Sequence, residues 1–418
     1  MKDFQKTNLK NGLRIITVPN KKVRTAAVLI LVGAGSKYEK KKENGISHFL
    51  EHMFFKGTKK RPDKKSIAEV LDRIGGDFNA FTSKEYTGYW AKVADRHLDL
   101  ALDWVSDIFL NSKIPSSEVE KERGVILEEI NMYLDNPQIY VGDLWEEVLY
   151  GDQPAGRQII GTKENILKFQ RRDLLNYFKN HYGSENTIVS IIGNFKENEV
   201  QEKIKKLFKN INESKIKDKE KTLEKQKKPK TLFHFKKTDQ THFCLGVRGY
   251  DILNPKRYSQ LIASIVLGGN MSSRLFLKVR EENSLAYYVH TSTENTTDTG
   301  YLVTQAGVPH KHFKKAVNLI LEEYKNLREK GISKEELKKA KNYLKGKMTL
   351  NLESIEAKAS FYSMAELLTG RILTLEEKLK IIDKVSLADV KRISQEMFQP
   401  ENLNLAVIGP HRKGEINI

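Results

Sequence analysis

The chain has 418 residues, which is enough for more than one domain and a sizeable hydrophobic core. Hydrophobic residues make up 39% of it and charged residues 30%, a composition typical of a globular protein that excludes an intrinsically disordered chain. The formal net charge of +18 raises the question of a nucleic-acid partner, but an excess of lysine also serves simply to keep a surface hydrated.

The sequence predicts a cytoplasmic protein. Residues 1–7 contain no apolar core of a signal peptide and lead directly into a strand predicted over 12–18. No apolar run approaches the roughly 18 residues of a transmembrane helix, so we expect no membrane contact. The single cysteine, Cys244, excludes an intramolecular disulfide and suits a reducing compartment.

A pentad of the form H-x-x-E-H occupies residues 48–52. On a helix, residues three and four apart share a face, so His48, Glu51 and His52 can converge on one point. Two neutral imidazoles at that spacing can bind zinc, which leaves the carboxylate between them to act on a bound water. The alternative interpretation is a histidine pair on a helix surface.

Strands and helices alternate around the pentad. Residues 25–32 and 187–192 are rich in Val and Ile and predict strands, and residues 66–74 predict a helix that ends at two glycines. The strand predicted over 78–82 follows that helix. Such a strand can bind an extended peptide by main-chain pairing, with little dependence on the peptide's side chains.

A catalytic zinc usually has three protein ligands, so a third is required. Residues 117–130 predict an amphipathic helix on which Glu122 and Glu129, seven positions apart, lie on nearly the same stripe. Glu128 is rotated about a third of a turn away from it. A carboxylate on a partly apolar stripe is costly without a partner, which favours Glu129 as a ligand and Glu122 as a group that orients a ligating imidazole. The alternative for each glutamate is a solvated helix face.

The densest basic stretch separates two halves of the chain. Residues 201–240 hold 14 lysines against 6 acidic residues. Residues 215–230 have almost no apolar periodicity and predict a linker. No interleaved aromatic residues or RNA-binding signature accompany the lysines, so we expect no nucleic-acid partner.

The two halves look like copies of one α+β unit. Residues 173–193 predict a helix, a turn and a strand, and residues 389–409 repeat this pattern at a constant offset (389 − 173 = 216). The second copy has no H-x-x-E-H pentad. We therefore predict two homologous α+β domains, each a mainly antiparallel sheet packed with helices: a zinc-bearing domain over 1–210, a lysine-rich linker over 211–231 and a second domain without a metal site over 232–418.

These features together resemble the pitrilysin (insulinase) family of zinc metallopeptidases, and in size the bacterial two-domain branch that is similar to mitochondrial processing peptidase. The resemblance extends from about residue 7 to 410. Besides the pentad, Glu122 and Glu129, it rests on four further segments, which are residues 32–36, residues 53–58, residues 75–82 and residues 268–287. Asn270, where many relatives have a third glycine, departs from the pattern.

The resemblance implies an endopeptidase with one Zn²⁺ per chain, bound by His48, His52 and Glu129. It also implies that Glu51 is the general base and that an enclosed chamber admits peptides and unfolded segments. Residues 75–82 resemble the family's substrate-binding edge strand, which implies a binding role for Asn79, Ala80 and Phe81.

Arg280 and Tyr287 resemble the family's Arg/Tyr pair, which positions the peptide main chain and donates a hydrogen bond to the oxyanion. From the sequence alone, a surface arginine and a packed strand aromatic are the alternative. We expect a homodimer, with a heterodimer containing an inactive homologue as the alternative. A non-catalytic peptide-binding or structural relative of processing peptidase is the alternative function.

Overall fold

The chain folds into two compact units, each assembled from segments that are not contiguous in the sequence. A computed structural model describes residues 4–214, 218–416 and 418. Unit 1 comprises Met1–Asn131, Gln158–Glu220 and Leu350–Thr374, and unit 2 comprises Met132–Arg157, Lys221–Thr349 and Leu375–Ile418. Within the described ranges, no helix is both long and apolar enough to cross a lipid bilayer.

Unit 1 contains a six-stranded sheet in the order β1-β2-β6-β3-β5-β4. All of its strand pairs are antiparallel except β2 with β6, which are parallel. The strands are Gln5–Asn8 (β1), Arg14–Pro19 (β2), Thr25–Val32 (β3), Asp77–Thr82 (β4), Thr87–Ala94 (β5) and Thr187–Gly193 (β6). The strand predicted over 25–32 is observed with the same bounds, and β4 lies at one edge of the sheet, as a strand that binds peptide requires.

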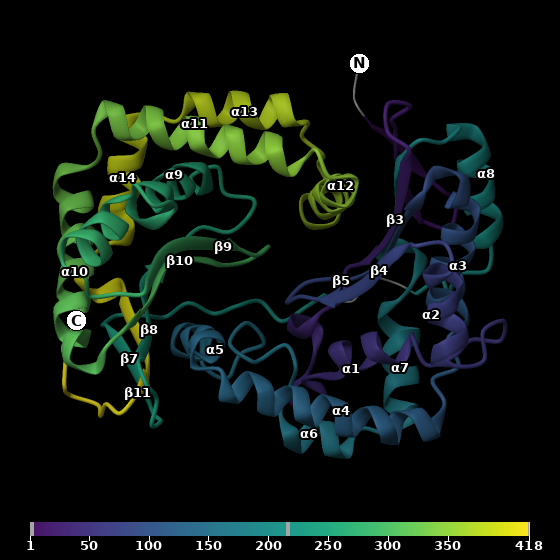
Figure 1. Cartoon of the computed structure of the whole chain (residues 1–418), viewed down its shortest axis with the longest axis horizontal. Helices are drawn as coiled ribbons and strands as arrows, with labels where there is room; N and C mark the ends of the chain where they lie inside the picture. Colours follow the sequence, from purple (N-terminus) through teal and green to yellow (C-terminus); the bar gives the residue numbers. More distant parts are fainter. Residues whose placement is uncertain (1–3, 215–217, 417) are drawn as a thin grey trace. The chain divides into compact units, whose positions relative to one another are not determined.

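Helices cover both faces of this sheet (Figure 1). The helices of unit 1 are Ile46–Met53 (α1), Lys64–Asp72 (α2), Leu98–Asn111 (α3), Ser116–Asp135 (α4, whose residues from Met132 on belong to unit 2), Lys163–Lys168 (α6), Arg171–His181 (α7), Glu197–Leu207 (α8) and Ile355–Thr369 (α12). One face packs on α12, through apolar residues such as Ala27, Leu29 and Leu31 of β3. The other face packs on α1 and α3 through an aromatic cluster in which the ring of Phe54 stacks on Tyr89 at 4.7 Å.

Unit 2 contains a five-stranded sheet in the order β7-β11-β8-β10-β9, parallel between β7 and β11 and otherwise antiparallel. Its strands are Lys230–Phe235 (β7), Thr241–Arg248 (β8), Tyr288–Asn295 (β9), Gly300–Val308 (β10) and Leu403–Gly409 (β11). Its helices are Pro137–Tyr150 (α5), Arg257–Gly268 (α9), Phe313–Lys330 (α10), Lys334–Asn351 (α11), Leu375–Lys384 (α13) and Leu387–Met397 (α14). Helix α5 covers one face of the sheet, where Cys244 is buried, and the main core lies on the other.

The two sheets repeat one another strand by strand. The order β2-β6-β3-β5-β4 of unit 1 corresponds to β7-β11-β8-β10-β9 of unit 2, with the same parallel and antiparallel pairings. The offset of 216 predicted from the sequence relates β6 to β11 (403 − 187 = 216) and β3 to β8 (241 − 25 = 216). The same offset places Ser264, Leu267 and Gly268 of α9 where α1 has His48, Glu51 and His52.

The units differ from the predicted domains 1–210 and 232–418 by an exchange of two helices. Helix α5 belongs to the first copy in sequence but packs on the sheet of unit 2, whereas its counterpart α12 (355 − 137 = 218) packs on the sheet of unit 1. An amphipathic helix must bury its apolar face, but the hydropathy pattern does not specify which of two similar sheets receives that face.

The predicted linker over 211–231 passes from unit 1 to unit 2, and residues 215–217 of it lie outside the described residues. Its described part is extended and held by side chains. In unit 1, Lys219 lies 3.5 Å from Glu85, and in unit 2 the main-chain N–H of Thr222 donates to Asp298 at 2.9 Å. Strand β7 begins at Lys230, so the linker ends at residue 229, two residues earlier than predicted.

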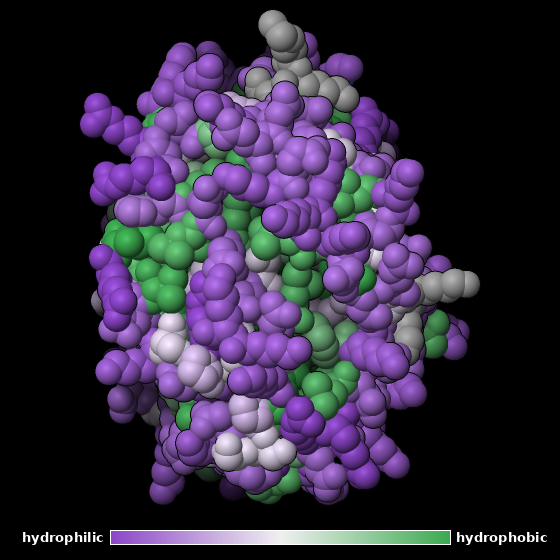
Figure 2. Space-filling model, turned by 90° about the vertical axis from the view of Figure 1, so that its right-hand side faces the viewer, coloured by the Kyte–Doolittle hydropathy of each residue, from purple (hydrophilic) through white to green (hydrophobic). Residues whose placement is uncertain are grey.

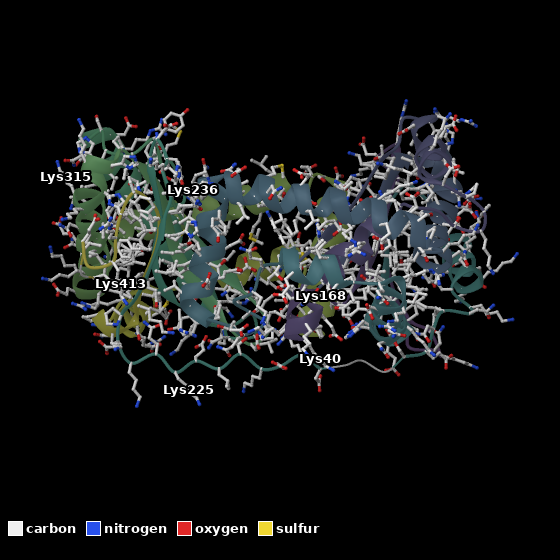
Figure 3. All side chains as sticks on the ribbon, turned by 90° about the horizontal axis from the view of Figure 1, so that it is seen from below. Lys40, Lys168, Lys225, Lys236, Lys315 and Lys413 are labelled. Atoms are coloured by element: carbon white, nitrogen blue, oxygen red, sulfur yellow. The ribbon has the colours of Figure 1, made fainter. Side chains whose placement is uncertain are left out.

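Many of the exposed residues are lysine or glutamate. Figure 2, which views the side of unit 1 formed by α2, α3 and α8, shows mainly hydrophilic residues with apolar patches between them. Figure 3 shows Lys225, Lys236, Lys315 and Lys413 spread around unit 2 rather than gathered in one patch. Several lysines are paired, such as Lys256 with Glu396 at 2.8 Å, which is consistent with a role in hydrating the surface.

Candidate metal centre

Helix α1 is held at its N-terminus by a buried carboxylate. Gly45 precedes the helix with φ of 101°, a left-handed conformation that favours glycine. The main-chain N–H groups of Gly45 and Ser47 each donate to Glu39 at 2.8 Å, and Asn44 Nδ2 donates to it at 3.0 Å. Burial raises the pKa of Glu39 to about 7, against the lowering effect of these hydrogen bonds. Glu39 therefore acts as a distant N-cap of the helix that carries the pentad.

The apolar side of α1 fixes its rotation about its own axis. Phe49, Leu50 and Met53 are fully buried against the rest of unit 1. His48, Glu51 and His52 occupy the other side and stay partly accessible, with exposed side-chain fractions of 13% for His48 and 21% for His52. The rings of the two histidines lie 4.6 Å apart between centroids. The helix thus presents both imidazoles to one point, as the pentad spacing predicts.

Helix α4 brings two glutamates to the same point. Val119, Ile126 and Ile130 bury one side of α4, and Glu122 is buried among them. Glu129 lies close to this side and is 23% exposed. Glu128 is exposed and accepts a hydrogen bond from Asn131 at 3.3 Å, so it faces away from α1.

His48, His52 and Glu129 form the group in the described residues whose ligand atoms all lie within 4.8 Å of one another. Nε2 of His48 lies 3.7 Å from one carboxylate oxygen of Glu129, and Nε2 of His52 lies 3.6 Å from the other. In a tetrahedral zinc site with ligand bonds of about 2.1 Å, two ligand atoms lie about 3.4 Å apart. The two imidazoles and the carboxylate therefore fit a zinc ion in both chemistry and spacing.

Glu122 binds the opposite nitrogen of His52. Its Oε1 lies 2.7 Å from His52 Nδ1, and its Oε2 forms an ion pair with Lys56. Burial alone raises the pKa of Glu122, but the hydrogen bonds with His52 and Lys56 outweigh burial and lower it. An ionised Glu122 keeps the proton of His52 on Nδ1, which leaves Nε2 free to bind a metal.

His48 is prepared for metal binding in a different way. Burial, together with the neighbouring His52, lowers the pKa of His48 to about 3, so its imidazole is neutral near pH 7. Its Nδ1 is buried and has no hydrogen-bond partner among the described residues. On its Nδ1 side the ring of His48 is therefore held by packing, whereas the ring of His52 is held there by a carboxylate.

Glu51 lies between the two histidines in sequence and outside the group of three. Burial raises the pKa of Glu51, and the hydrogen bond from Thr82 and the proximity of His52 lower it in part. The hydroxyl of Thr82 donates to Oε2 of Glu51 at 2.5 Å. A partly buried carboxylate with a raised pKa next to a metal site is suited to accept and release a proton.

Strand β4 carries Asn79, Ala80 and Phe81. The side chain of Asn79 is exposed, and its Oδ1 accepts a hydrogen bond from the N–H of Ala80 at 2.9 Å. The ring of Phe81 packs on the sheet face covered by α12. Among the described strands, β4 pairs only with β5, so its other edge has main-chain groups available for an additional strand.

Arg280 and Tyr287 belong to unit 2. Arg280 lies in a helical segment, Phe276–Glu282, with its guanidinium 4.9 Å from the ring of Phe276. Tyr287 precedes β9 and is 77% exposed, which differs from the packed aromatic considered as the alternative. Its main-chain N–H donates to Gly307 at 3.1 Å. Neither residue is part of the zinc-binding group in unit 1, and their roles stay predictions.

Sequence reasoning missed three residues that support this centre, namely Glu39, Lys56 and Thr82. Glu39 and Lys56 lie close to the pentad in the chain, but no periodic pattern identifies a carboxylate that caps a helix from seven residues upstream or a lysine that pairs with α4. Both Lys56 and Thr82 lie in segments that resemble the family, residues 53–58 and 75–82. The position of Thr82 at the end of a strand gives no sign that its hydroxyl reaches α1.

Two protein-family models match the chain. Residues 14–163 match the model described as insulinase (peptidase family M16), and residues 168–344 match the model described as the peptidase M16 inactive domain. The first match includes all three members of the zinc-binding group.

Similar proteins extend over nearly the whole chain. The uncharacterized zinc protease YmxG of Bacillus subtilis is 38% identical over 402 residues, which are 96% of this chain and 97% of that protein. An uncharacterized zinc protease of Mycobacterium leprae is 34% identical over 409 residues, covering 97% of this chain and 92% of that protein.

Two solved structures share the fold. A protease from Helicobacter pylori superimposes with a TM-score of 0.90 at 24% identity and covers 97% of this chain and 99% of its own. A peptidase M16 inactive domain from Pseudomonas fluorescens gives a TM-score of 0.91 at 16% identity and covers 98% of both chains. At these identities the likeness establishes the two-sheet α+β fold.

Proposed function

Because the chain belongs to the insulinase family of peptidases (peptidase family M16), we propose that it is a zinc-dependent endopeptidase in which Glu51 is the general base. The observation that carries the proposal is the convergence of His48, His52 and Glu129 within 4.8 Å, with Glu51 on the same helix as the two histidines. Relatives named zinc proteases support zinc as the metal.

The mechanism assigns a separate task to each residue. Zinc, when bound by His48, His52 and Glu129, supplies a Lewis acid for the scissile carbonyl and lowers the pKa of a water toward about 7. Glu51 accepts a proton from the attacking water and then passes it to the leaving amine. Glu122 keeps Nε2 of His52 directed toward Glu129 throughout the cycle.

Peptide binding by β4 is the second part of the proposal. An extended peptide adds to the open edge of β4 through main-chain hydrogen bonds and so runs past the end of α1. Asn79, Ala80 and Phe81 form the middle of that edge. Arg280 positions the peptide main chain and Tyr287 donates to the oxyanion, and the exposure of Tyr287 is compatible with that role.

The working unit in this proposal is a homodimer that encloses its active sites. The chain carries two copies of the α+β unit, with the zinc-binding group in one and Arg280 and Tyr287 in the other. In two chains related by a two-fold axis, the zinc-binding group of one protomer would work with Arg280 and Tyr287 of the other. Closed two-fold dimers are the commonest oligomers. An enclosed chamber admits peptides and unfolded segments. The complete set of zinc ligands and Glu51 gives no support to a non-catalytic relative.

Zinc analysis combined with a peptide-library digest tests the function. We expect about one zinc per chain, loss of peptide cleavage on treatment with a chelator and recovery when zinc is restored. A purified protein that binds zinc but cleaves no peptide would contradict the endopeptidase proposal. A protein that cleaves peptides without any metal would contradict the mechanism.

A further inference from the structure

The carboxylate of Glu51 has one hydrogen-bond partner in the described part of the chain. The hydroxyl of Thr82 donates to Oε2 at 2.5 Å, and Oε1 forms no hydrogen bond or ion pair with the described residues. The two oxygens of the general base are therefore not equivalent. Oε1 is the oxygen that remains available for a proton.

The register of β4 directs Thr82 toward α1. Side chains alternate between the faces of a strand, so Phe78, Ala80 and Thr82 share one face. The ring of Phe78 packs 4.9 Å from Trp104 of α3, on the face of the sheet that also contacts α1. A slip of one residue would turn Thr82 away from Glu51 and expose the ring of Phe78, so packing maintains the contact.

Residues that precede α1 in the chain hold the turn after Thr82. Thr82 pairs with Thr87, and the N–H of Ser83 donates to Tyr86 at 2.8 Å to close the hairpin. The N–H of Ser36 donates to the carbonyl of Ser83 at 3.2 Å. At Gly35 a Cβ atom would lie 2.3 Å from that same carbonyl, so only glycine permits this close approach. The chain before α1 thus supports the hairpin that carries Thr82.

We propose that Thr82 is a positioning residue for the general base: its hydroxyl holds Oε2 of Glu51, so that Oε1 takes the proton of the attacking water and returns it to the leaving amine. This inference rests on the proposed function. Because β4 is also the proposed peptide-binding strand, one strand aligns both the substrate and the base that acts on it.

The experiment compares four variants of the full-length, zinc-loaded protein on a short fluorogenic peptide. Thr82→Val replaces the hydroxyl by a methyl group and keeps a β-branched side chain in the strand. Thr82→Ser keeps a hydroxyl. Glu51→Gln and the double variant Glu51→Gln/Thr82→Val complete a double-mutant cycle. Thr7→Val, in the opposite edge strand β1, is the matched control, since its hydroxyl bonds to Gln201.

We expect Thr82→Val to lower kcat about ten- to hundredfold, the effect of losing one hydrogen bond to a charged group. Its KM, zinc content and melting temperature should match those of the wild type, because the hydroxyl binds neither the metal nor the peptide. Thr82→Ser should restore most of kcat, and Thr7→Val should leave it unchanged. In the Glu51→Gln background, Thr82→Val should cause no further loss, since the group that it positions is already absent.

Several outcomes would overturn the inference. If Thr82→Val keeps the wild-type kcat, or if its effect is as large with Gln at position 51, Thr82 does not act through Glu51. If only KM rises or zinc is lost, Thr82 serves binding or structure. In each of these cases the wild type still cleaves peptides, so the proposed function survives. A wild type without any peptidase activity would instead refute the proposed function, and this inference with it.

Discussion

Nδ1 of His52 and Oε1 of Glu122 lie 2.7 Å apart, so the ring of this histidine is held by a carboxylate on the side that faces away from the zinc-binding group. The second oxygen of Glu122 pairs with Lys56, which lies four residues after His52 and just beyond the end of α1. Glu122 of α4 thereby joins the two helices through His52 of α1, which is itself a member of the zinc-binding group. The orientation of His52 depends on this link.

Glu122→Gln should therefore weaken zinc binding without abolishing it. The amide can still accept from Nδ1 of His52, but it loses the charge that favours that tautomer and the ion pair with Lys56. We expect a fall in zinc affinity of about 10- to 100-fold, measured by competition with a chelating indicator. Glu128→Gln, at an exposed position of the same helix, is the control and should leave affinity unchanged. Equal affinities for all three proteins would show that Glu122 does not orient the ligand.

The cap at the start of α1 predicts a pH dependence of stability. The pKa of Glu39 is raised to about 7, from 4.5 for an ordinary glutamate. Between these two values the folded state holds a proton that the unfolded state has released, so the contribution of Glu39 to stability falls as pH rises from about 4.5 to 7. The full effect is on the order of 3 kcal/mol.

Glu39→Gln should remove this pH dependence. The variant also carries a pH-independent cost, because an amide donor replaces a carboxylate oxygen that accepts from Gly45 and Asn44. The measurement is the difference in free energy of unfolding between wild type and variant, determined by urea denaturation at several values between pH 5 and 8. Glu69→Gln, at a partly exposed helix position where the carboxylate pairs with Arg73, serves as control. A difference that stays constant over this range would show that Glu39 does not titrate there.

Much of this architecture follows from local sequence patterns. The run of Val, Ile and Leu over 25–32 predicts β3 with its observed bounds, because a strand buried on both faces needs apolar residues throughout. The pentad and the spacing of Glu122 and Glu129 identify the residues that the structure brings together, because helical periodicity determines which side chains share a face.

The remaining features depend on contacts between segments distant in the chain. The exchange of α5 and α12 between the units depends on which sheet each helix meets, and both sheets present similar apolar faces. The hydrogen bond from Thr82 to Glu51 joins a strand to a helix 31 residues away, and no periodic pattern reports such a contact.

An enclosed chamber predicts selection by size. Short peptides and a permanently unfolded protein should be cleaved, whereas a stable folded protein of similar sequence length should resist. The measurement is a time course of digestion of one protein in its native and its reduced, carboxymethylated forms, followed by electrophoresis. Rapid digestion of the native form would contradict the chamber and would favour an open groove along β4.

Complementation tests the homodimer with shared sites. Glu51→Gln and Tyr287→Phe chains with different affinity tags are co-expressed, and the mixed dimer is isolated. If Tyr287 acts on the partner's zinc centre, one site carries both substitutions and the other carries neither, so about half of the wild-type activity should return. Each homodimer, prepared separately, is the control and should be nearly inactive. A mixed dimer no more active than these controls would show that Tyr287 acts within its own chain or not at all.

The central claim is that Glu51 acts as the general base and does not bind the metal. A paired measurement of zinc content and kcat tests this claim most directly. Glu51→Gln should retain about one zinc per chain and lose nearly all peptide hydrolysis, because the amide cannot accept the proton of the water. Glu129→Gln should lose zinc together with activity, because it removes a charged ligand oxygen. A Glu51→Gln protein that cleaves peptides at the wild-type rate, with its zinc in place, would contradict the mechanism.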